Sequence, residues 1–232
     1  MGTLGYGYGS EWHMMRYLGR HRSALSSAIS SRIGCSDISW LDFPFDAKKK
    51  FGDSEWKGLD FLTAEYAPIR SRWEQEWPQT GNVMNWDAVG WTKNDPSGEL
   101  VLVEAKSNIE EIKSSCGAQE HGGLPRIRSF LNQAKQRFRV PEAVDWLQPY
   151  YQYCNRLAML DFLMSKGIPT QLVFIYFTGD KVPGKTCPID CAGWKPTLDR
   201  IKSSIGLGSE SSLDRVTEVF LPIVPSVPVL GE

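Results

Sequence analysis

The sequence predicts an α/β fold, with a mixed central sheet in which an antiparallel meander is continued by parallel strands and flanked by helices. Two short apolar runs, 99–107 and 170–179, have the β-rich composition of strands in the middle of a sheet. Longer segments around them carry the three- and four-residue apolar spacing of helices. The 232 residues, of which 41% are hydrophobic, suit one domain spanning residues 1–232.

The first half of the chain predicts a helix and then the meander. Residues 10–31 place apolar side chains along one side of a helix, with Ser10 as its cap and Gly34 suited to its end. The stretch 73–91 is expected to form two extended pieces around the turn-forming sequence QTGN. A second turn, KNDPSG, leads into 99–107 and would complete three antiparallel strands.

The second half predicts helices and two parallel strands. Residues 108–140 indicate helical pieces around a loop, and 142–166 indicate the strongest helix, divided by Pro149. A helix near 196–207 follows the strand at 170–179.

The last strand is expected near 215–223. It should pair in parallel with 170–179 through a right-handed crossover. The C-terminal tail from residue 222 contains three prolines and is expected to form an extended arm.

Composition and charge exclude several classes of protein. No run of about 18 apolar residues is present, which argues against a membrane-spanning helix, and no secretory signal is visible, so we expect a cytoplasmic protein without a membrane partner. The 26 basic and 27 acidic residues neither indicate nor exclude nucleic acid, because net charge averages local patches away. Five irregularly spaced cysteines predict reduced thiols, and Cys187 and Cys191 lack the second ligand pair of a zinc site.

Two charged residues continue the buried line of the predicted strand 99–107. Side chains alternate along a strand, so Leu100, Leu102, Glu104 and Lys106 share one face. Buried charges are costly unless they are paired or bind a metal. Glu104 and Lys106 are therefore candidates for a functional site.

An acid on the preceding strand is expected beside them. A hairpin centred near Asp95–Pro96 puts Asp87 opposite Glu104, and centring it one residue later puts Asp87 opposite Lys106. Both registers bring the three side chains together on one face. A glycine bulge at Gly98 would shift the pairing by one residue and turn Asp87 to the other face of the sheet.

Two carboxylates beside an amine are typical of a site for a small hard cation. Magnesium is held by one or two carboxylates, with water and substrate phosphate completing its shell. Such an ion neutralises charge on a phosphate and lowers the pKa of a bound water. The lysine can position or deprotonate that water, or stabilise the transition state. The predicted site therefore suits phosphodiester hydrolysis.

These residues and the order of elements resemble the PD-(D/E)xK nuclease superfamily, which has the restriction-endonuclease-like fold. Asp87, Glu104 and Lys106 match its Asp and Glu-x-Lys, whereas Trp86 stands in place of its proline. The resemblance covers about residues 10–178. It implies a Mg²⁺- or Mn²⁺-dependent hydrolase that cleaves nucleic acid, with DNA favoured over RNA, and a homodimer is considered as well.

The resemblance implies further ligands at the site. Superfamily members often bring another acid from the first helix, and Glu11 is the candidate to hold a second ion or water, with Glu74 and Glu76 as substitutes. The alternative for Glu11 is that it favours the positive end of its helix. The backbone carbonyl of Ala105, between Glu104 and Lys106, is the expected third metal ligand.

The segment YYQYCNRLAML is similar to an extra motif of exonuclease-type branches, in which a Gln lies on the helix after the Glu-x-Lys strand. Gln152 and Arg156 share one helix face, with Asn155 adjacent. They would bind the phosphate of the cleaved strand or brace the carboxylates, the alternative being a solvated polar face. The bases of 126–139 fall on several sides of a helix, which favours a solvated face over phosphate contacts.

A second class of function remains open from the sequence. The chain could be a non-catalytic nucleic-acid-binding or protein-interaction module that keeps a nuclease-like scaffold. The presence of Asp87, Glu104 and Lys106 together favours the enzyme.

Overall fold

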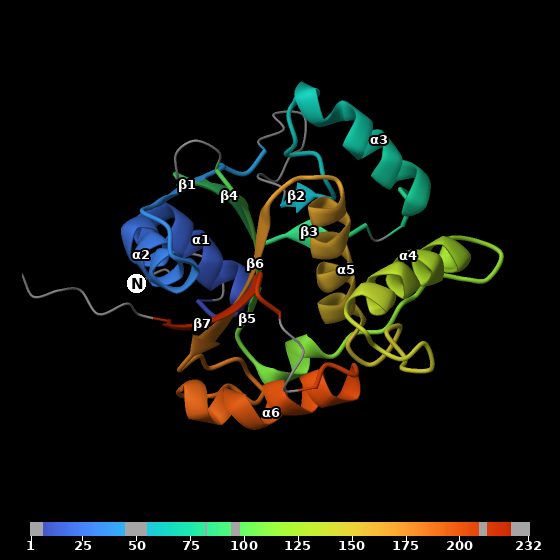
Figure 1. Cartoon of the computed structure of the whole chain (residues 1–232). Helices are drawn as coiled ribbons and strands as arrows, with labels where there is room; N and C mark the ends of the chain where they lie inside the picture. Colours follow the sequence, from blue (N-terminus) through green and yellow to red (C-terminus); the bar gives the residue numbers. More distant parts are fainter. Residues whose placement is uncertain (1–6, 45–54, 82, 94–97, 209–212, 224–232) are drawn as a thin grey trace, which may run out of the picture.

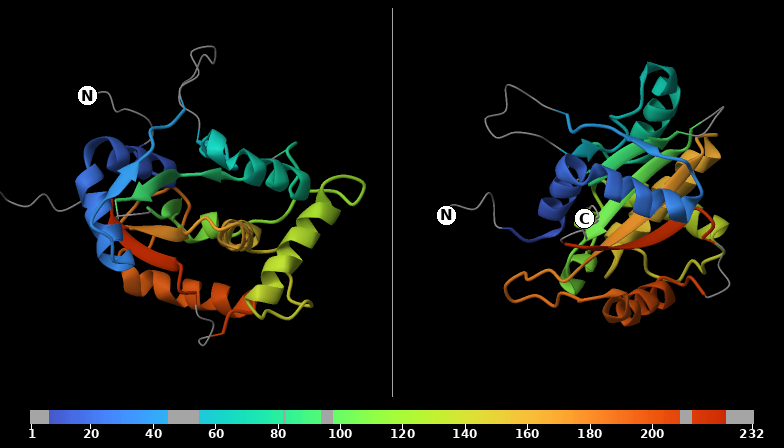
Figure 2. Two further views of the ribbon diagram at one scale, coloured as in Figure 1. Left: turned by 45° about the horizontal axis from the view of Figure 1, so that its top comes forward. Right: turned by 90° about the vertical axis from the view of Figure 1, so that its left-hand side faces the viewer.

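A mixed sheet runs through the middle of the molecule, with helices on both of its faces (Figures 1 and 2). The computed structural model describes residues 7–44, 55–81, 83–93, 98–208 and 213–223. The expected α/β class is confirmed, since an antiparallel meander is continued by parallel strands.

The sheet has five strands in the order β1-β4-β5-β6-β7. The pairs β1–β4 and β4–β5 are antiparallel, whereas β5–β6 and β6–β7 are parallel. The strands are β1 (Ile38–Trp40), β4 (Ala88–Thr92), β5 (Leu100–Lys106), β6 (Thr170–Thr178) and β7 (Val216–Pro222). A separate antiparallel pair is formed by β2 (Trp56–Lys57) and β3 (Asn85–Trp86).

Helices divide between the two faces of the sheet. One face is covered by α1 (Ser10–Arg20) and α2 (Arg22–Ile33). The other carries α3 (Ala67–Glu76), α4 (Leu124–Arg137), α5 (Tyr151–Ser165) and α6 (Cys191–Ser204), together with the short 3-10 helices η1 (Ala64–Tyr66) and η2 (Ile109–Ile112). No helix in the described residues is long and apolar enough to cross a membrane.

The alternation along β5 separates two hydrophobic cores. Val101, Val103 and Ala105 pack with α1 and α2, whereas Leu100 and Leu102 pack in the core around α5. The prediction that alternate residues of this strand share one face is therefore confirmed. Glu104 and Lys106 lie on the same face as Leu100 and Leu102, the face toward α5.

The register between β4 and β5 decides between the two predicted hairpins. Ala88 is paired with Val103, and the N–H of Asp87 donates to the carbonyl of Val103 at 3.2 Å. Asp87 therefore stands opposite Glu104, as expected for the hairpin centred near Asp95–Pro96, although residues 94–97 of the turn lie outside the described part.

The single N-terminal helix was a wrong prediction, because the chain forms two helices that meet at His21. The break redirects the chain so that Leu25 and Ile29 of α2 are buried, as Met14 of α1 is. Gly9 is the N-cap of α1, and no side chain caps it, so Ser10 does not play that part. The C-cap of α2 is Gly34, in the left-handed conformation expected of it.

The predicted strand at the start of 73–91 is also wrong, since residues 73–76 end α3. A proline in the first turn favours this helix, and Trp73 enters the core from it. The first strand of the meander is instead β1, whose Ile38 pairs with Thr92. This strand comes from an earlier part of the chain.

Two helix boundaries in the second half differ from the prediction. The helix expected over 142–166 begins only at Tyr151, because a proline interior to a helix removes a hydrogen bond. The preceding segment is anchored separately, since the indole of Trp146 donates to the carbonyl of Ile205 at 2.8 Å. Helix α6 begins earlier than predicted because Asp190 caps it.

The strand predicted near the C-terminus is β7, and it is parallel to β6 as expected. The predicted arm lies mostly in residues 224–232, outside the described part of the chain.

Candidate functional site

Glu104 lies at the centre of the predicted site. Its residue is only 3% exposed, on the α5 side of β5. One carboxylate oxygen accepts a hydrogen bond from Lys106, and the other accepts from Nε of Arg156 at 2.8 Å. Burial alone would raise the pKa of this carboxyl, but the charges of Arg156 and Lys106 outweigh it and hold the pKa below its ordinary value. Glu104 is therefore an ionised, doubly paired carboxylate.

The pKa of Asp87 is shifted in the opposite direction to that of Glu104. It connects β3 to β4, and its Oδ2 accepts the backbone N–H of Ala105 at 2.7 Å. Burial, and then the negative charge of Glu104, raise the pKa of Asp87 well above its ordinary value, although Lys106 opposes them. A nearby cation would favour the ionised form of this carboxyl.

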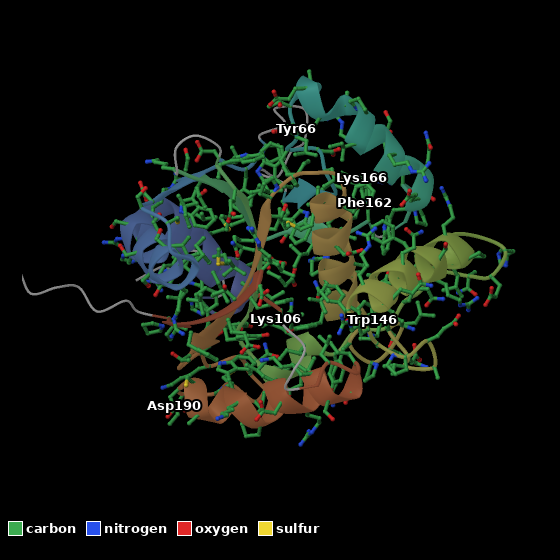
Figure 3. All side chains as sticks on the ribbon, in the orientation of Figure 1. Tyr66, Lys106, Trp146, Phe162, Lys166 and Asp190 are labelled. Carbon is green, nitrogen blue, oxygen red and sulfur yellow. The ribbon has the colours of Figure 1, made fainter. Side chains whose placement is uncertain are left out.

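Lys106 ends β5 and lies on the α5 side of the sheet (Figure 3). Burial alone would lower its pKa, but the charges of Glu104 and Asp87 raise it above the ordinary value. The side chain is therefore an ammonium ion at neutral pH. Such a group can orient a water or stabilise negative charge, but it holds its proton too tightly to deprotonate a water.

Arg156 connects α5 to this site. It is 3% exposed, and its guanidinium lies 4.7 Å from the centre of the Trp86 ring. The same group donates to the carbonyl of Asn85 at 2.6 Å and to Oδ1 of Asn155 at 2.8 Å. Asn155 and Arg156 are buried, so the solvated-face alternative is wrong for them. The contacts of Arg156 are those of a residue that braces Glu104.

Gln152 lies in the first turn of α5. It borders a small hollow together with Glu104, Lys106 and Tyr153. Its backbone N–H donates to the hydroxyl of Ser114 at 2.7 Å, which holds the start of α5 against the chain that follows β5. The side chain is thus near the two charged residues of β5.

Glu11 is not brought to this group. It is exposed at the start of α1, in the helical layer that covers the other face of the sheet. In the described part of the chain no hydrogen bond or ion pair joins it to Asp87, Glu104 or Lys106. Its place in the first turn matches the alternative that it favours the positive helix end.

The substitute acids Glu74 and Glu76 are on α3 rather than on a strand. Glu74 is exposed, and Glu76 pairs with Arg72 one turn earlier. Within the described residues, no hydrogen bond or ion pair joins either of them to the carboxylates of the predicted site.

The structure adds Glu55, which the sequence did not single out. In the antiparallel pair β2–β3, Trp56 pairs with Trp86. Glu55, the residue before Trp56, is therefore opposite Asp87, the residue after Trp86. Its negative charge contributes to the raised pKa of Asp87. No sequence pattern links two residues this far apart, so only the pairing of β2 with β3 could find it.

The oxygen atoms around Asp87 and Glu104 can be compared with the ligands that the expected cation prefers. No group of three or more His, Cys, Asp or Glu side chains in the described residues is arranged to hold a metal. Asp87 and Glu104 form a pair of carboxylates. The carbonyl of Ala105 points to the same side of β5 as its N–H, which donates to Asp87. Two carboxylates and one carbonyl fit Mg²⁺, which keeps several waters, better than a metal that prefers His or Cys.

Most of the other candidate residues have structural roles. Arg128 and Arg137 of α4 form ion pairs, and buried Lys135 donates to a backbone carbonyl. His13 of α1 is buried, with Nε2 3.1 Å from a carboxylate oxygen of Asp180 just after β6 and its ring against that of Phe177. All five cysteines are free thiols.

Comparisons of the chain with models of protein families, with curated proteins and with solved structures find no match.

Proposed function

We propose that this chain is a metal-dependent nuclease of the PD-(D/E)xK type, with a restriction-endonuclease-like sheet, that hydrolyses phosphodiester bonds of DNA in preference to RNA. The observation that carries the proposal is the pairing of Asp87 with Glu104 beside the ammonium of Lys106. Two carboxylates and two cations gathered in a largely buried place are costly unless they are paired or bind a metal, which supports a functional site.

Asp87, Glu104 and the carbonyl of Ala105 would hold Mg²⁺ or Mn²⁺. Bound there, the cation would polarise the phosphate and lower the pKa of a water. The raised pKa of Asp87 supports this assignment, because burial and the charge of Glu104 disfavour its ionised form, and a bound cation would favour it.

Three side chains would position the carboxylate, the attacking water and the phosphate. Arg156 fixes the position of Glu104 and keeps it ionised. The ammonium of Lys106 would orient the attacking water and stabilise the charge that develops on the phosphate. Gln152, at the edge of the same hollow, would hydrogen bond to the phosphate of the cleaved strand.

A second candidate is a nucleic-acid-binding or protein-interaction module without turnover. The observation that favours it is the complete pairing of Glu104, whose two oxygens are already held by Lys106 and Arg156. A carboxylate in that state attracts a further cation less strongly than a free one.

Cleavage assays with single- and double-stranded DNA and RNA, with Mg²⁺, Mn²⁺ or EDTA, separate the two candidates. The nuclease requires cleavage that EDTA abolishes. Asp87→Ala and Glu104→Ala should lose cleavage and metal binding together, as measured by calorimetry. Lys106→Ala should lose cleavage and keep most of its metal affinity, because an ammonium is not a ligand.

The matched control is Lys113→Ala, which changes an exposed lysine outside the site. It should leave both readouts unchanged. If Lys106→Ala cuts as well as the parent, or Asp87→Ala binds metal equally well, the assignment is wrong. Binding of nucleic acid without cleavage under any of these conditions would favour the second candidate.

A further inference from the structure

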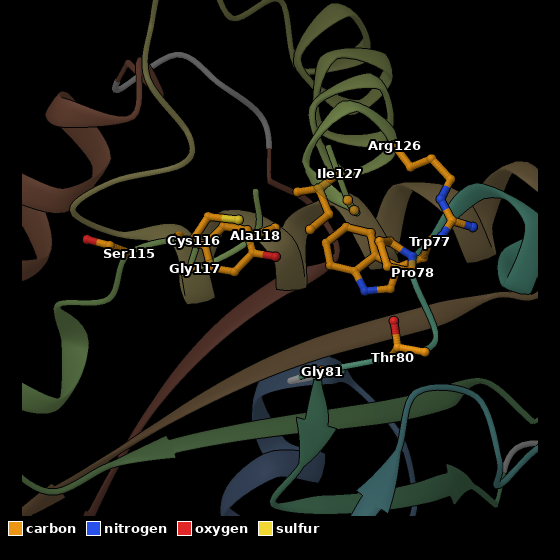
Figure 4. Close-up of a pocket in the computed structure, with 13 residues that line it drawn as sticks. Trp77, Pro78, Thr80, Gly81, Ser115, Cys116, Gly117, Ala118, Arg126 and Ile127 are labelled. Atoms are coloured by element: carbon orange, nitrogen blue, oxygen red, sulfur yellow. The ribbon is translucent and has the colours of Figure 1, made fainter. Parts of the chain in front are cut away.

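A cavity of about 620 Å³ opens near the first turns of α4 and α5, and Figure 4 shows residues that line it. It lies between the segment 77–81, the loop 115–123 and the first turn of α4. A volume of this size is within the usual range for pockets that hold small organic ligands. The proposed cleavage of a nucleic-acid backbone makes no use of it.

The cavity adjoins the charged residues through α5. Tyr151 borders the cavity, and Gln152, the next residue, borders the hollow that contains Glu104 and Lys106. Asn155, one turn after Tyr151 on the same helix, accepts a hydrogen bond from Arg156 at 2.8 Å. The cavity and the hollow are therefore bordered by consecutive residues of α5.

The lining has the chemistry of a site for a nucleotide. Arg126 is the one charged side chain among the described lining residues, which include no carboxylate. It forms no ion pair with a described residue, whereas Arg128 and Arg137 on the same helix do. The other walls combine apolar and hydroxyl groups, from Trp77, Pro78, Thr80, Ser115, Ala118, Ile127 and Tyr151. Apolar walls suit the faces of a base, hydroxyls suit its edge, and the guanidinium suits a phosphate.

Glycines leave part of the wall without side chains. Gly81, Gly117, Gly122 and Gly123 all border the cavity. A Cβ added at Gly117 would meet no atom within 4 Å. The backbone therefore has open space beside it at this point, which a larger side chain would occupy.

We propose that this cavity binds one unpaired nucleotide of a nucleic-acid strand, next to the phosphodiester bond at the proposed site. A base can enter a pocket only when it is not stacked and paired inside a duplex. The substrate class is therefore single strands and unpaired strand ends, in preference to blunt duplexes. Its cleavage rests on the proposed function, whereas the binding does not.

Binding is measured in EDTA, so that the result does not depend on turnover. The probes are a fluorescein-labelled DNA single strand and the blunt duplex that it forms with its complement. We expect the single strand to bind about tenfold or more tightly than the duplex, since base stacking dominates such binding. Gly117→Leu should weaken single-strand binding by about tenfold, and Arg126→Gln should weaken it and reduce its dependence on salt.

The matched control is Gly19→Leu on α1, where an added Cβ also meets no atom within 4 Å. It should bind like the parent, and thermal melting should show that all variants are folded. The single strand should also protect Cys116, which borders the cavity, from alkylation, while exposed Cys191 stays reactive.

Equal binding of single strand and duplex, or equal effects of Gly117→Leu and Gly19→Leu, would overturn the inference. A protein that binds single strands in this way but never cleaves them would support the cavity and refute the nuclease.

Discussion

Glu104 gains its two cationic partners from different parts of the chain, Lys106 from the same strand and Arg156 from α5. The guanidinium also satisfies the carbonyl of Asn85 and lies over Trp86. Removing one partner of a buried ion pair leaves the other charge without compensation, which costs more than the pair contributes. The arginine should thus be important for stability as well as for the position of Glu104.

Arg156→Ala is expected to lower the free energy of unfolding by about 3 kcal/mol, because Glu104 loses a buried partner. Arg128→Ala removes an exposed ion pair with Glu120 and should leave the stability nearly unchanged. Urea unfolding followed by tryptophan fluorescence compares them. Equal losses in the two variants would contradict the structural role of Arg156.

Unlike the Arg156–Glu104 pair, the ionised carboxylate of Asp87 is expected to destabilise the folded protein. Its pKa is raised in the folded state, so folding favours the protonated carboxyl. The stability that the protonated carboxyl contributes is fully present below the pKa of an aspartate in the unfolded chain, which is about 4. It is lost as pH rises through the higher pKa that Asp87 has in the folded protein. The amide of Asp87→Asn carries no charge and can still accept the N–H of Ala105. This variant should therefore melt at a higher temperature than the parent at neutral pH in EDTA.

The difference should shrink as pH falls, since the parent then becomes protonated. Saturating Mg²⁺ should raise the melting temperature of the parent but not that of Asp87→Asn. Thermal melting across pH, with and without Mg²⁺, measures both effects. A variant that is less stable than the parent at neutral pH in EDTA would show that the carboxylate is not destabilising.

At the scale of elements, the small β2–β3 pair holds Asp87 and Glu55 near each other. Gly58 follows β2 with φ +52°, and its N–H donates to the carbonyl of Met84 at 2.8 Å. Its carbonyl accepts from the indole of Trp86 at 2.9 Å. The ring of Trp73 lies where a side chain at Gly58 would start.

Gly58→Ala should therefore cost about 3 kcal/mol or more, because backbone strain adds to a collision with Trp73. The control is Gly167→Ala, with φ +79° and no atom within 4 Å of the added Cβ. It should cost only about 1 kcal/mol, from backbone strain alone. Urea denaturation measures both, and equal losses would mean that the Trp73 ring moves aside freely.

Local patterns carried the successful predictions. The apolar runs predicted β5 and β6, and strand alternation predicted which face Glu104 and Lys106 share. The short connection between β4 and β5 restricted the register of Asp87 to two choices. Each of these inferences uses residues that are neighbours in the sequence.

The failures involve partners that are distant in the sequence. Strand β1 has three residues, too few for a pattern, and it pairs with β4 far along the chain. The contact of Arg156 with Glu104 and the position of Glu55 opposite Asp87 depend in the same way on tertiary structure. A helix period could show that Arg156 and Gln152 share a face, but not that the arginine is buried.

At the scale of the whole molecule, the sheet separates two cores and the candidate site belongs to only one of them. The core of α1 and α2 meets the end of β6, where Asp180 accepts the N–H of Gly9 at 2.9 Å and lies beside His13. On the other side, α5 supplies Arg156 to the site and Tyr151 to the cavity. Changes in the first core should therefore affect stability more than site chemistry.

The mixed pairing of β5 also has a consequence for the order of folding. Leu100 pairs with Trp91, nine residues earlier, and with Thr170, seventy residues later. Closing the longer loop costs about 2 kcal/mol more in chain entropy. The β4–β5 hairpin should therefore form in the folding transition state, before β6 and β7 dock.

Stopped-flow kinetics can test this order. Val89→Ala in β4 should mainly slow refolding, whereas Val219→Ala in β7 should mainly accelerate unfolding, and the reverse pattern would contradict it. Because the hairpin carries Asp87 and Glu104, the two acids would meet in water before α5 delivers Arg156. Their repulsion would then slow the early step, so refolding should be faster in mildly acidic solution, where one carboxyl is protonated.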